Sequence, residues 1–266
     1  MISVSLSTLL QLFQLLALPL SMDLYTQIND DLVTKMNFFK KNISHILCRI
    51  NNFIYIQKLL SSGVDILFPN TIEVRGELIT KGKIKIERNI IFAGSVTLED
   101  GVIIESNCFL KDCIIRSGTI IKSHSRLNGC EININSSIGP YARIRPDTSI
   151  GRDSQIGNFV EIKKSTIGSN AKINHLSYIG DSEIGDNVII GAGCVTCNYD
   201  GVETQKTYIE DSAFIGSGVF LIAPVKVGKS STIGSGSIIT DDVPSEKLTL
   251  ARTKQKTIDN WNRPKK

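Results

Sequence analysis

One histidine of the chain has a sequence context that suits proton transfer. His175 is one of only three histidines and lies in the stretch INHLSYI, residues 173–179. A neutral imidazole can accept a proton near neutral pH, for example from an amine or a hydroxyl that attacks a thioester. An ordinary surface histidine fits the same pattern equally well, so the spacing alone leaves both interpretations open.

Two positively charged residues are separated by a multiple of six, which is the period of the repeat described below. Arg145 and Lys163 are separated by eighteen positions, so a coil of about eighteen residues places them side by side on one face. Together they suit a phosphate dianion, which an arginine can hold with two parallel hydrogen bonds. A solvated charged face is the alternative. Glu161 lies about one coil before His175, and we expect it to orient the imidazole.

Two further stretches offer groups for a ligand. The turn sequence Asn198-Tyr199-Asp200-Gly201 is either a plain turn or a source of polar contacts to a sugar or an amine. Gly191-Ala192-Gly193 combines small side chains with backbone amides that we expect to be open to a ligand. Such amides suit a pantetheine arm or the oxyanion of a tetrahedral intermediate.

These residues are embedded in a repeat of six. A period of six fits neither a helix nor a simple strand and is typical of a hexapeptide β-solenoid, with three hexads in each triangular coil. We expect roughly nine or ten coils and a prism about 45 Å long. A β-sandwich does not produce so many hexads in phase. The inward positions are predicted to be Ile72, Leu78, Ile84, Ile90, Val96, Val102, Cys108, Ile114, Ile132, Ile138, Ile144, Ile150, Ile156, Ile162, Ile167, Ile173, Ile179, Ile184, Ile190, Ile209, Ile215, Leu221, Val227, Ile233 and Ile239.

The remaining segments flank or interrupt this repeat. Residues 22–62 contain no Gly or Pro and have apolar positions at three- and four-residue spacing, which predicts one or two helices that end at Gly63. We therefore expect a helical segment at 1–62, a β-helix domain at 63–245 and a tail at 246–266. Residues 196–206 break the phase and predict an extra loop. The apolar run at 9–20 is too short to span a bilayer and has no early positive charge, and Met22 is an alternative start.

Composition narrows the function classes. The 266 residues are 41% hydrophobic, 21% charged and 6% aromatic, which favours a packed β-rich fold over disorder. The net charge of +4 is not gathered in basic runs, so we expect no nucleic-acid partner. Six cysteines without a second CxxC pair predict reduced thiols and no zinc site. We expect no metal, no membrane association and a cytoplasmic location.

From about Leu59 to Lys266 the chain resembles a known family. The family is the bacterial bifunctional N-acetylglucosamine-1-phosphate uridylyltransferase / glucosamine-1-phosphate acetyltransferase, and the likeness is to its C-terminal half. The motifs that carry the resemblance are GPYARIRP (139–146), IGNFVEIKKSTIG (156–168), NHLSYIGDSEIGDNV (174–188), IGAG with TCNYDG (190–201), LIAPVKVGK (221–229) and WNRPKK (261–266). The resemblance implies an all-β, left-handed parallel β-helix that forms a homotrimer with active sites between subunits.

The resemblance also implies an activity and roles for single residues. The family transfers acetyl from acetyl-CoA to the amine of glucosamine-1-phosphate, in the UDP-N-acetylglucosamine pathway. It implies His175 as the general base and Arg145 and Lys163 as ligands of the sugar phosphate. It places Tyr178, Asn198 and Tyr199 along the sugar and acetyl region, and Ala192, Ser217, Ser235 and Arg252 along the coenzyme A groove.

Two departures and one absence qualify this expectation. Ile189 stands where the family usually has Asn, and Thr204 stands where it usually has Lys, so a polar contact is lost at each position. Residues 1–58 contain no Gly and hence no glycine-rich nucleotide loop, so we expect no uridylyl transfer and no magnesium. A separate uridylyltransferase would then take the product. The alternatives are an acyltransferase for a related amino sugar and a catalytically silent trimeric scaffold.

Overall fold

The N-terminal helix is continuous and ends where the sequence predicts. The structure is a computed structural model that describes residues 22–259 and 261, so the expectations for residues 1–21 and for most of the WNRPKK motif lie outside it. Helix α2 (Met22–Ser61) is a single helix. Gly63 has a φ of 90°, and the amides of Gly63 and Val64 donate to the carbonyls of Leu60 and Leu59 at 3.1 Å each. This is a Schellman C-cap, which requires a left-handed residue at Gly63.

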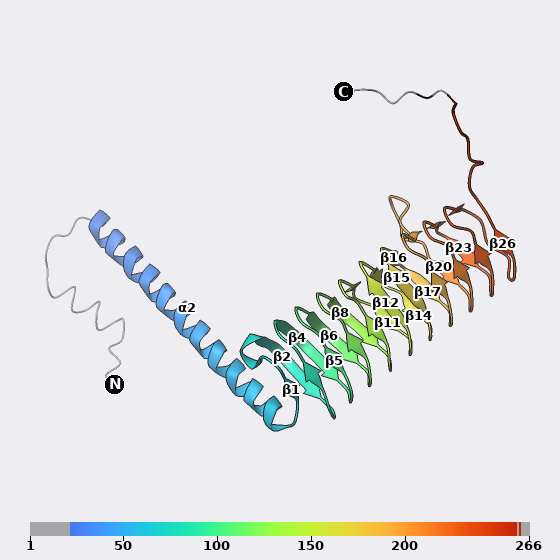
Figure 1. Cartoon of the computed structure of the whole chain (residues 1–266). Coiled ribbons are helices and arrows are strands. Elements are labelled where there is room, and N and C mark those ends of the chain that lie inside the picture. The colour runs from blue at the N-terminus through green and yellow to red at the C-terminus, as the bar shows by residue number, and fades with distance from the viewer. Residues whose placement is uncertain (1–21, 260, 262–266) are drawn as a thin grey trace, which may run out of the picture. The chain divides into compact units, whose positions relative to one another are not determined.

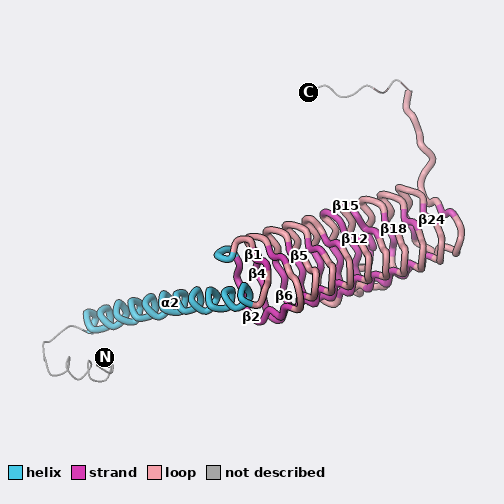
Figure 2. The backbone as a smooth tube through the Cα atoms, turned by 60° about the horizontal axis from the view of Figure 1, so that its bottom comes forward, coloured by secondary structure: helices cyan, strands magenta, loops and turns pink. Residues whose placement is uncertain are grey.

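Parallel strands then wind into a solenoid, as the coils stacked along one axis in Figures 1 and 2 show. One sheet, here called face A, has eleven strands within residues 22–259. Its strands, in spatial order, are β1 (Asp65–Ile66), β3 (Lys85–Ile86), β5 (Ile103–Ile104), β7 (Ile120–Ile121), β9 (Ser137–Ile138), β12 (Gln155–Asn158), β15 (Lys172–His175), β18 (Ile189–Ile190), β21 (Phe214–Ile215), β24 (Thr232–Ile233) and β26 (Leu248–Thr249).

The second sheet has fifteen strands in the described chain and covers the other two faces. Its long strands bend round a corner: β2 (Ile72–Thr80), β4 (Ile90–Leu98), β6 (Phe109–Ile115) and β8 (Arg126–Ile132). Beyond β8 it divides. Face B holds β10 (Arg143–Ile144), β13 (Glu161–Lys163), β16 (Tyr178–Gly180), β19 (Val195–Cys197), β22 (Phe220–Ile222) and β25 (Ile238–Ile239). Face C holds β11 (Thr148–Ile150), β14 (Thr166–Ile167), β17 (Ser182–Ile184), β20 (Thr207–Ile209) and β23 (Val225–Val227). A short 3-10 helix, η1 (Pro69–Thr71), precedes β2.

The core is a stack of aliphatic side chains, as the hexads predict. Ile156, Ile173, Ile190, Ile215 and Ile233 pair in register through five successive coils, and all are buried. The expected β-helix of hexapeptide repeats is therefore confirmed. Each inward aliphatic side chain packs on its equivalent one coil away, which removes its apolar surface from contact with water.

One predicted inward position is wrong, and the coil number is slightly higher than expected. Ile114 is 37% exposed, whereas Cys113 and Ile115 are buried. The step from Cys108 to Cys113 is five residues rather than six, which shifts the phase by one and turns Ile114 outward. Eleven strands on face A also exceed the nine or ten coils expected, because β26 forms a further rung inside the segment predicted as tail.

The chain divides into two compact units at Phe53–Ile54. Residues of the last two turns of α2 belong to the second unit, since Ile56 and Leu59 are buried in the solenoid core. The domain boundaries at 62/63 and 245/246 stay predictions. The expected extra loop is present between β19 and β20, where residues 198–206 connect the two strands.

Candidate active site

His175 lies at the end of β15, on the edge of face A, and its side chain is exposed. Its Nδ1 is 2.7 Å from Oδ1 of Asn158. Strands β12 and β15 place these two residues directly opposite each other, one coil apart. The sequence reasoning missed Asn158, although its position, seventeen residues before His175, is one coil length.

The residues expected along coenzyme A continue the same row. Ala192, Ser217 and Ser235 each follow an inward isoleucine of face A by two positions, as His175 does. Backbone hydrogen bonds join the row from coil to coil: Gly193 N to His175 O, Gly218 N to Ala192 O and Gly236 N to Ser217 O. The row therefore runs parallel to the solenoid axis, with about 4.8 Å between rungs.

Arg252 lies at the far end of this row. Its Nη1 donates to the carbonyl oxygen of Ser235 at 3.0 Å, and its side chain is exposed. The structure thus brings together all four residues expected along the coenzyme A groove. It aligns them in one direction from His175.

At the corner beside this row, the residues change from large side chains to glycines after the coil of His175. In the three coils up to His175 the corner carries Tyr141, Phe159 and Leu176, and the first two rings stack at 5.2 Å between centroids. In the next three coils the equivalent residues are Gly193, Gly218 and Gly236, with φ near 70°. All six hold a left-handed backbone conformation. Only the glycines leave the space beside the row open.

The other border of the row is packed closely against the next coil. Gly191 and Gly216 directly precede Ala192 and Ser217. A Cβ on either would come within 2.6 Å of a backbone nitrogen in the next coil. We call the surface bounded by these glycines the glycine groove, and it consists of Ala192, Ser217 and Ser235 with Gly191, Gly216 and Gly234 on one side and Gly193, Gly218 and Gly236 on the other.

One expectation for this groove is wrong. The amides of Gly191 and Gly193 were expected to be open to a ligand, but they donate to the carbonyls of Ile215 and His175 at 2.8 and 3.2 Å. They hold adjacent coils together. Beneath the groove, the thiol of Cys194 donates to the carbonyl of Gly216. Burial raises the pKa of Cys194, so this thiol stays protonated and takes a structural role.

The predicted phosphate ligands lie on face B. Strand β10 pairs with β13, which sets Arg145, the residue after β10, beside Lys163 in the next coil. Arg145 Nη1 donates to Glu161 Oε1 at 2.9 Å, and Arg143 lies 3.6 Å from the other oxygen of Glu161. The prediction that Glu161 orients His175 is therefore wrong. Its carboxylate is taken by the two arginines, and Asn158 contacts the imidazole instead.

Lys163 is connected to the extra loop through a carboxylate. Its Nζ lies 3.7 Å from Oδ2 of Asp181, and the same oxygen accepts a hydrogen bond from Nδ2 of Asn198. Asp181 also accepts the amide of Thr207 at its backbone carbonyl. Asp181 thus holds both ends of the loop, at Asn198 and Thr207, next to Lys163. Sequence reasoning missed this aspartate.

Tyr178 lies on the same face as these groups. Its neighbour in the preceding coil is Glu161. Its hydroxyl occupies the space over Gly180, where an added Cβ would come within 2.5 Å of it. Gly180 is in turn paired with Lys163. Glycine at this position therefore lets the tyrosine ring lie along the strand toward the cations.

The extra loop is a small hairpin. Tyr199 bridges Thr204 in antiparallel fashion, and Asp200 Oδ1 accepts the amides of Val202 and Glu203 at 2.8 and 2.7 Å. These two hydrogen bonds lower the pKa of Asp200. Asn198 is buried, whereas Tyr199 is exposed. The expected turn is confirmed, and of the two predicted ligand contacts in the loop, Asn198 and Tyr199, the exposed one is Tyr199.

The structure gathers the predicted residues into two groups rather than one. His175 and the glycine groove lie on face A, while Arg145, Lys163, Tyr178 and Asn198 lie on or beside face B. The corner at Leu176 and Ser177 separates them. Ile189 is 40% exposed on face A, paired with Lys172 and Phe214, and Thr204 is exposed in the loop.

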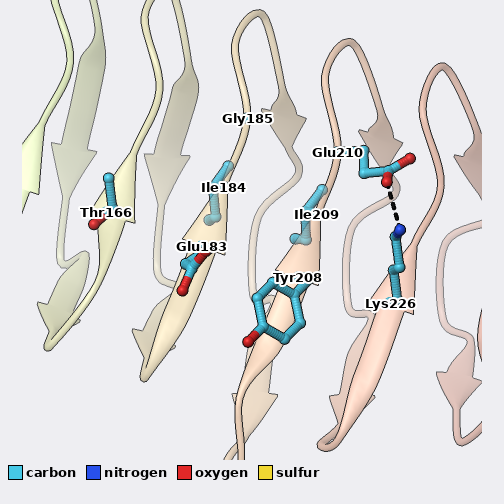
Figure 3. A pocket seen from close by; sticks show the side chains of 8 residues that line it. All are labelled: Thr166, Glu183, Ile184, Gly185, Tyr208, Ile209, Glu210 and Lys226. Atoms are coloured by element: carbon cyan, nitrogen blue, oxygen red, sulfur yellow. Dashed lines mark ion pairs between the residues drawn. The ribbon is translucent and has the colours of Figure 1, made fainter.

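A separate hollow on face C contains none of the predicted residues. It is lined by Thr166, Glu183, Ile184, Gly185, Tyr208, Ile209, Glu210 and Lys226. Figure 3 shows Lys226 directed toward Glu210 across two strands, and these two groups form an ion pair of 2.7 Å. The third charged residue of the hollow, Glu183, pairs with Lys206 at 2.6 Å, and no residue of the expected chemistry faces the hollow.

Within the described residues there is no group of three His, Cys, Asp or Glu side chains that could hold a metal ion. Within residues 22–259, no helix has both the length and the apolar character that a membrane crossing requires.

Comparison with known proteins confirms the resemblance that the motifs carry. The chain is 49% identical over 208 residues to the Bifunctional protein GlmU of Herminiimonas arsenicoxydans, covering 78% of this chain and 46% of that protein. It is 47% identical over 218 residues to the Bifunctional protein GlmU of Ralstonia pickettii, covering 82% and 48%. The chain thus spans about half the length of the curated relatives it matches.

Family models also match parts of the solenoid. Residues 130–221 match the model of the GMPPB C-terminal domain, and residues 206–241 match the hexapeptide repeat of succinyl-transferase. A similar solved structure is that of LpxA from Acinetobacter baumannii, with 17% identity, coverage of 68% of this chain and 71% of that chain, and a TM-score of 0.48.

Proposed function

We propose that this chain is a glucosamine-1-phosphate N-acetyltransferase. It transfers acetyl from acetyl-CoA to the sugar amine and yields N-acetylglucosamine-1-phosphate for the synthesis of UDP-N-acetylglucosamine. The observation that carries this proposal is the row that begins at His175 and continues through Ala192, Ser217 and Ser235 to Arg252. The relatives that match over about four fifths of the chain support the same activity.

The glycine groove fits the donor substrate. A pantetheine arm is long and thin, and the open corner at Gly193, Gly218 and Gly236 gives it room along three coils. Arg252, at the end of the row, supplies a cation for the phosphates of coenzyme A. The acetyl end of the arm then lies at the His175 end of the groove.

The reaction needs one proton acceptor. The sugar amine attacks the thioester carbon, a C–N bond forms and the C–S bond breaks. His175 accepts the proton that the amine loses, through Nε2, and coenzyme A leaves as a thiolate that then takes up a proton. General-base catalysis of this kind contributes about 10²- to 10⁴-fold in rate.

The acceptor phosphate belongs to face B in this proposal. Arg145 and Lys163 are adjacent there, and both side chains remain partly exposed, at 36% and 23%. Because side chains on two faces of a triangular prism diverge, the His175 of one copy works with the cations of another. The protein is accordingly a homotrimer with its sites at the seams between copies.

The acetylation assay tests the activity directly. Purified protein is given acetyl-CoA and glucosamine-1-phosphate, and coenzyme A thiol release is followed. We expect turnover that falls about 10²-fold or more in His175→Ala, with His124→Ala as a control on the same corner region. Equal rates in the wild type and His175→Ala would remove His175 from the mechanism.

A mixing experiment tests the shared site. His175→Ala is expected to be nearly inactive, and Arg145→Ala is expected to be slow at glucosamine-1-phosphate concentrations below the wild-type KM, where the mixture is assayed. The two variants are unfolded together and refolded as mixed trimers. Some seams then combine an intact His175 with an intact Arg145, so activity should return. A mixture as inactive as its parents would place both groups in one copy, and native mass spectrometry would establish that mixed trimers had formed.

A related amino sugar is the second candidate acceptor, because two positions favour it. Ile189 is exposed and apolar, and Thr204 is an exposed neutral side chain beside the loop tyrosine. A panel of amino sugars, each with and without a 1-phosphate, distinguishes the candidates. A preference for an unphosphorylated sugar would contradict the role given to Arg145 and Lys163.

A silent scaffold is the remaining alternative. Calorimetry with coenzyme A decides it, since a protein without a donor site shows no binding heat. Uridylyl transfer by a separate protein and a cytoplasmic location stay predictions of the same proposal.

A further inference from the structure

Asn158 contacts His175 through its side chain and the following residue, Leu176, through its backbone. The side-chain oxygen lies 2.7 Å from His175 Nδ1, and the backbone carbonyl accepts the amide of Leu176 at 3.0 Å. Asn158 belongs to β12, which pairs in register with β15. The amide is therefore held at a fixed height beside the imidazole by the solenoid itself.

The chemistry of this contact fixes where the imidazole proton lies. A carbonyl oxygen can only accept a hydrogen bond, so Nδ1 must carry the hydrogen. In a neutral imidazole the other nitrogen, Nε2, then has the lone pair. The partner of one ring nitrogen thereby decides which nitrogen can take up a proton.

We propose that Asn158 is a positioning residue that holds His175 in the Nδ1–H tautomer, with Nε2 presented to the substrate amine. This inference rests on the proposed acetyl transfer. It assigns to a neutral amide the orienting role that a carboxylate fills in other base–orienter pairs. Because the amide is neutral, it selects the tautomer without attracting a second proton to the ring.

No other side chain competes for this role among the described residues. The next coil places Ala192 beside His175, and Glu161 is paired with Arg145 and Arg143. The titratable groups nearest in the chain are Lys172, at the start of β15, and Tyr178, on β16 across the corner. Neither contacts the imidazole.

Nitrogen-15 NMR of the histidine rings reads the tautomer without any need for activity. The three histidines are assigned with single His→Gln variants. At a pH where the ring is neutral, wild-type His175 should show the Nδ1–H pattern. Asn158→Leu should lose it in favour of a mixture, and Asn158→Asp should keep it, since a carboxylate also accepts from Nδ1–H. Gln155→Leu, on the same strand, is the matched control and should leave the pattern unchanged.

Kinetics provide the second readout. Asn158→Leu should lower kcat about 10- to 100-fold, which is part of the contribution expected of a general base. The KM values for both substrates should change little. Asn158→Asp should restore most of kcat. Circular dichroism of both variants shows whether each is folded, and Asn158→Asp still tests the contact if Asn158→Leu does not fold.

The two proposals fail in different ways. An Nε2–H pattern in the wild-type ring, or an unchanged ring pattern in Asn158→Leu, overturns the role of Asn158 whatever the activity. An Nδ1–H pattern that depends on Asn158, in a protein that transfers no acetyl group, leaves the positioning contact in place and overturns the proposed function.

Discussion

Glu161 accepts a hydrogen bond from Arg145 at 2.9 Å, so the guanidinium expected to bind phosphate is already oriented by a carboxylate. Arg143, two residues away, is the more exposed arginine, with 58% of its side chain accessible against 36% for Arg145. The two arginines share Glu161. They differ in position along face B, and only Arg145 lies beside Lys163.

This difference supplies a matched test of the phosphate site. Arg145→Ala and Lys163→Ala should each raise the KM for glucosamine-1-phosphate about tenfold or more, since each removes a charge-assisted hydrogen bond of roughly 1.5–3 kcal/mol. The KM for acetyl-CoA should not change. Initial rates over a range of both substrates measure these constants. Arg143→Ala is the control. An equal rise in KM in this variant would show that positive charge on face B acts in general and that Arg145 and Lys163 make no specific contact with the phosphate.

The open corner at Gly193 predicts a second effect, on the donor. Gly193→Asn keeps the left-handed backbone, which Asn tolerates better than other side chains, and adds a side chain beside the groove. The KM for acetyl-CoA should rise roughly tenfold, a change of about 1.4 kcal/mol. Gly63→Asn, at another open left-handed position, is the control. If both variants bind coenzyme A like the wild type in calorimetry, the glycine groove is not the donor site.

For Ile189→Asn we expect tighter binding of the acceptor rather than weaker binding. Ile189→Asn places a polar group where the resembling family usually has one. It should lower the KM for glucosamine-1-phosphate about three- to tenfold, as one added net hydrogen bond of roughly 0.5–1.5 kcal/mol would. Ile134→Asn replaces an isoleucine of similar exposure, 39% against 40%, far from the site. An unchanged KM in Ile189→Asn would show that position 189 does not contact the acceptor.

The loop hairpin predicts a pH dependence. The amides of Glu203 and Val202 hold the pKa of Asp200 below its ordinary 3.8. A lowered pKa in the folded state means that the carboxylate stabilises the loop above the ordinary pKa and stops doing so as pH falls through the lowered one. The NMR amide shifts of Val202 and Glu203 should therefore stay constant from neutral pH to about 4 and change below it.

Asp200→Asn is the control for this titration. An asparagine side chain still offers an oxygen to both amides but does not ionise, so its amide shifts should not titrate. Amides that change equally in both proteins would assign the transition to another group.

The repeat made most of the solenoid predictable, because an inward residue is dictated by its own coil and by the two next to it. The five-residue step from Cys108 to Cys113 was enough to misplace Ile114, because counting in sixes does not show where a corner is one residue shorter. The left-handed corner residues show the same limit. The hexads do not indicate that Tyr141 and Phe159 take a left-handed conformation and stack on each other at the corner.

The site was less predictable than the fold for a related reason. Coil length correctly placed Arg145 beside Lys163. Ala192, Ser217 and Ser235 were implied by the family resemblance, and the strand register aligns them in the row that His175 begins. Coil length did not identify which polar side chains contact one another. Glu161 and Asn158 both lie about one coil before His175, and only the strand register shows that the amide faces the imidazole. The distribution of residues over two faces also depends on where each corner falls.

His175 sits on β15, the seventh of the eleven rungs of face A within residues 22–259. In a one-dimensional array each rung is stabilised by its nearest neighbours, so unravelling starts at the termini and advances inward. Four rungs toward the C-terminus must open before β15 loses a neighbour. Fraying of the C-terminal rungs therefore leaves His175 in place. Truncation from the C-terminus should remove the Arg252 end of the donor groove well before it disturbs the imidazole.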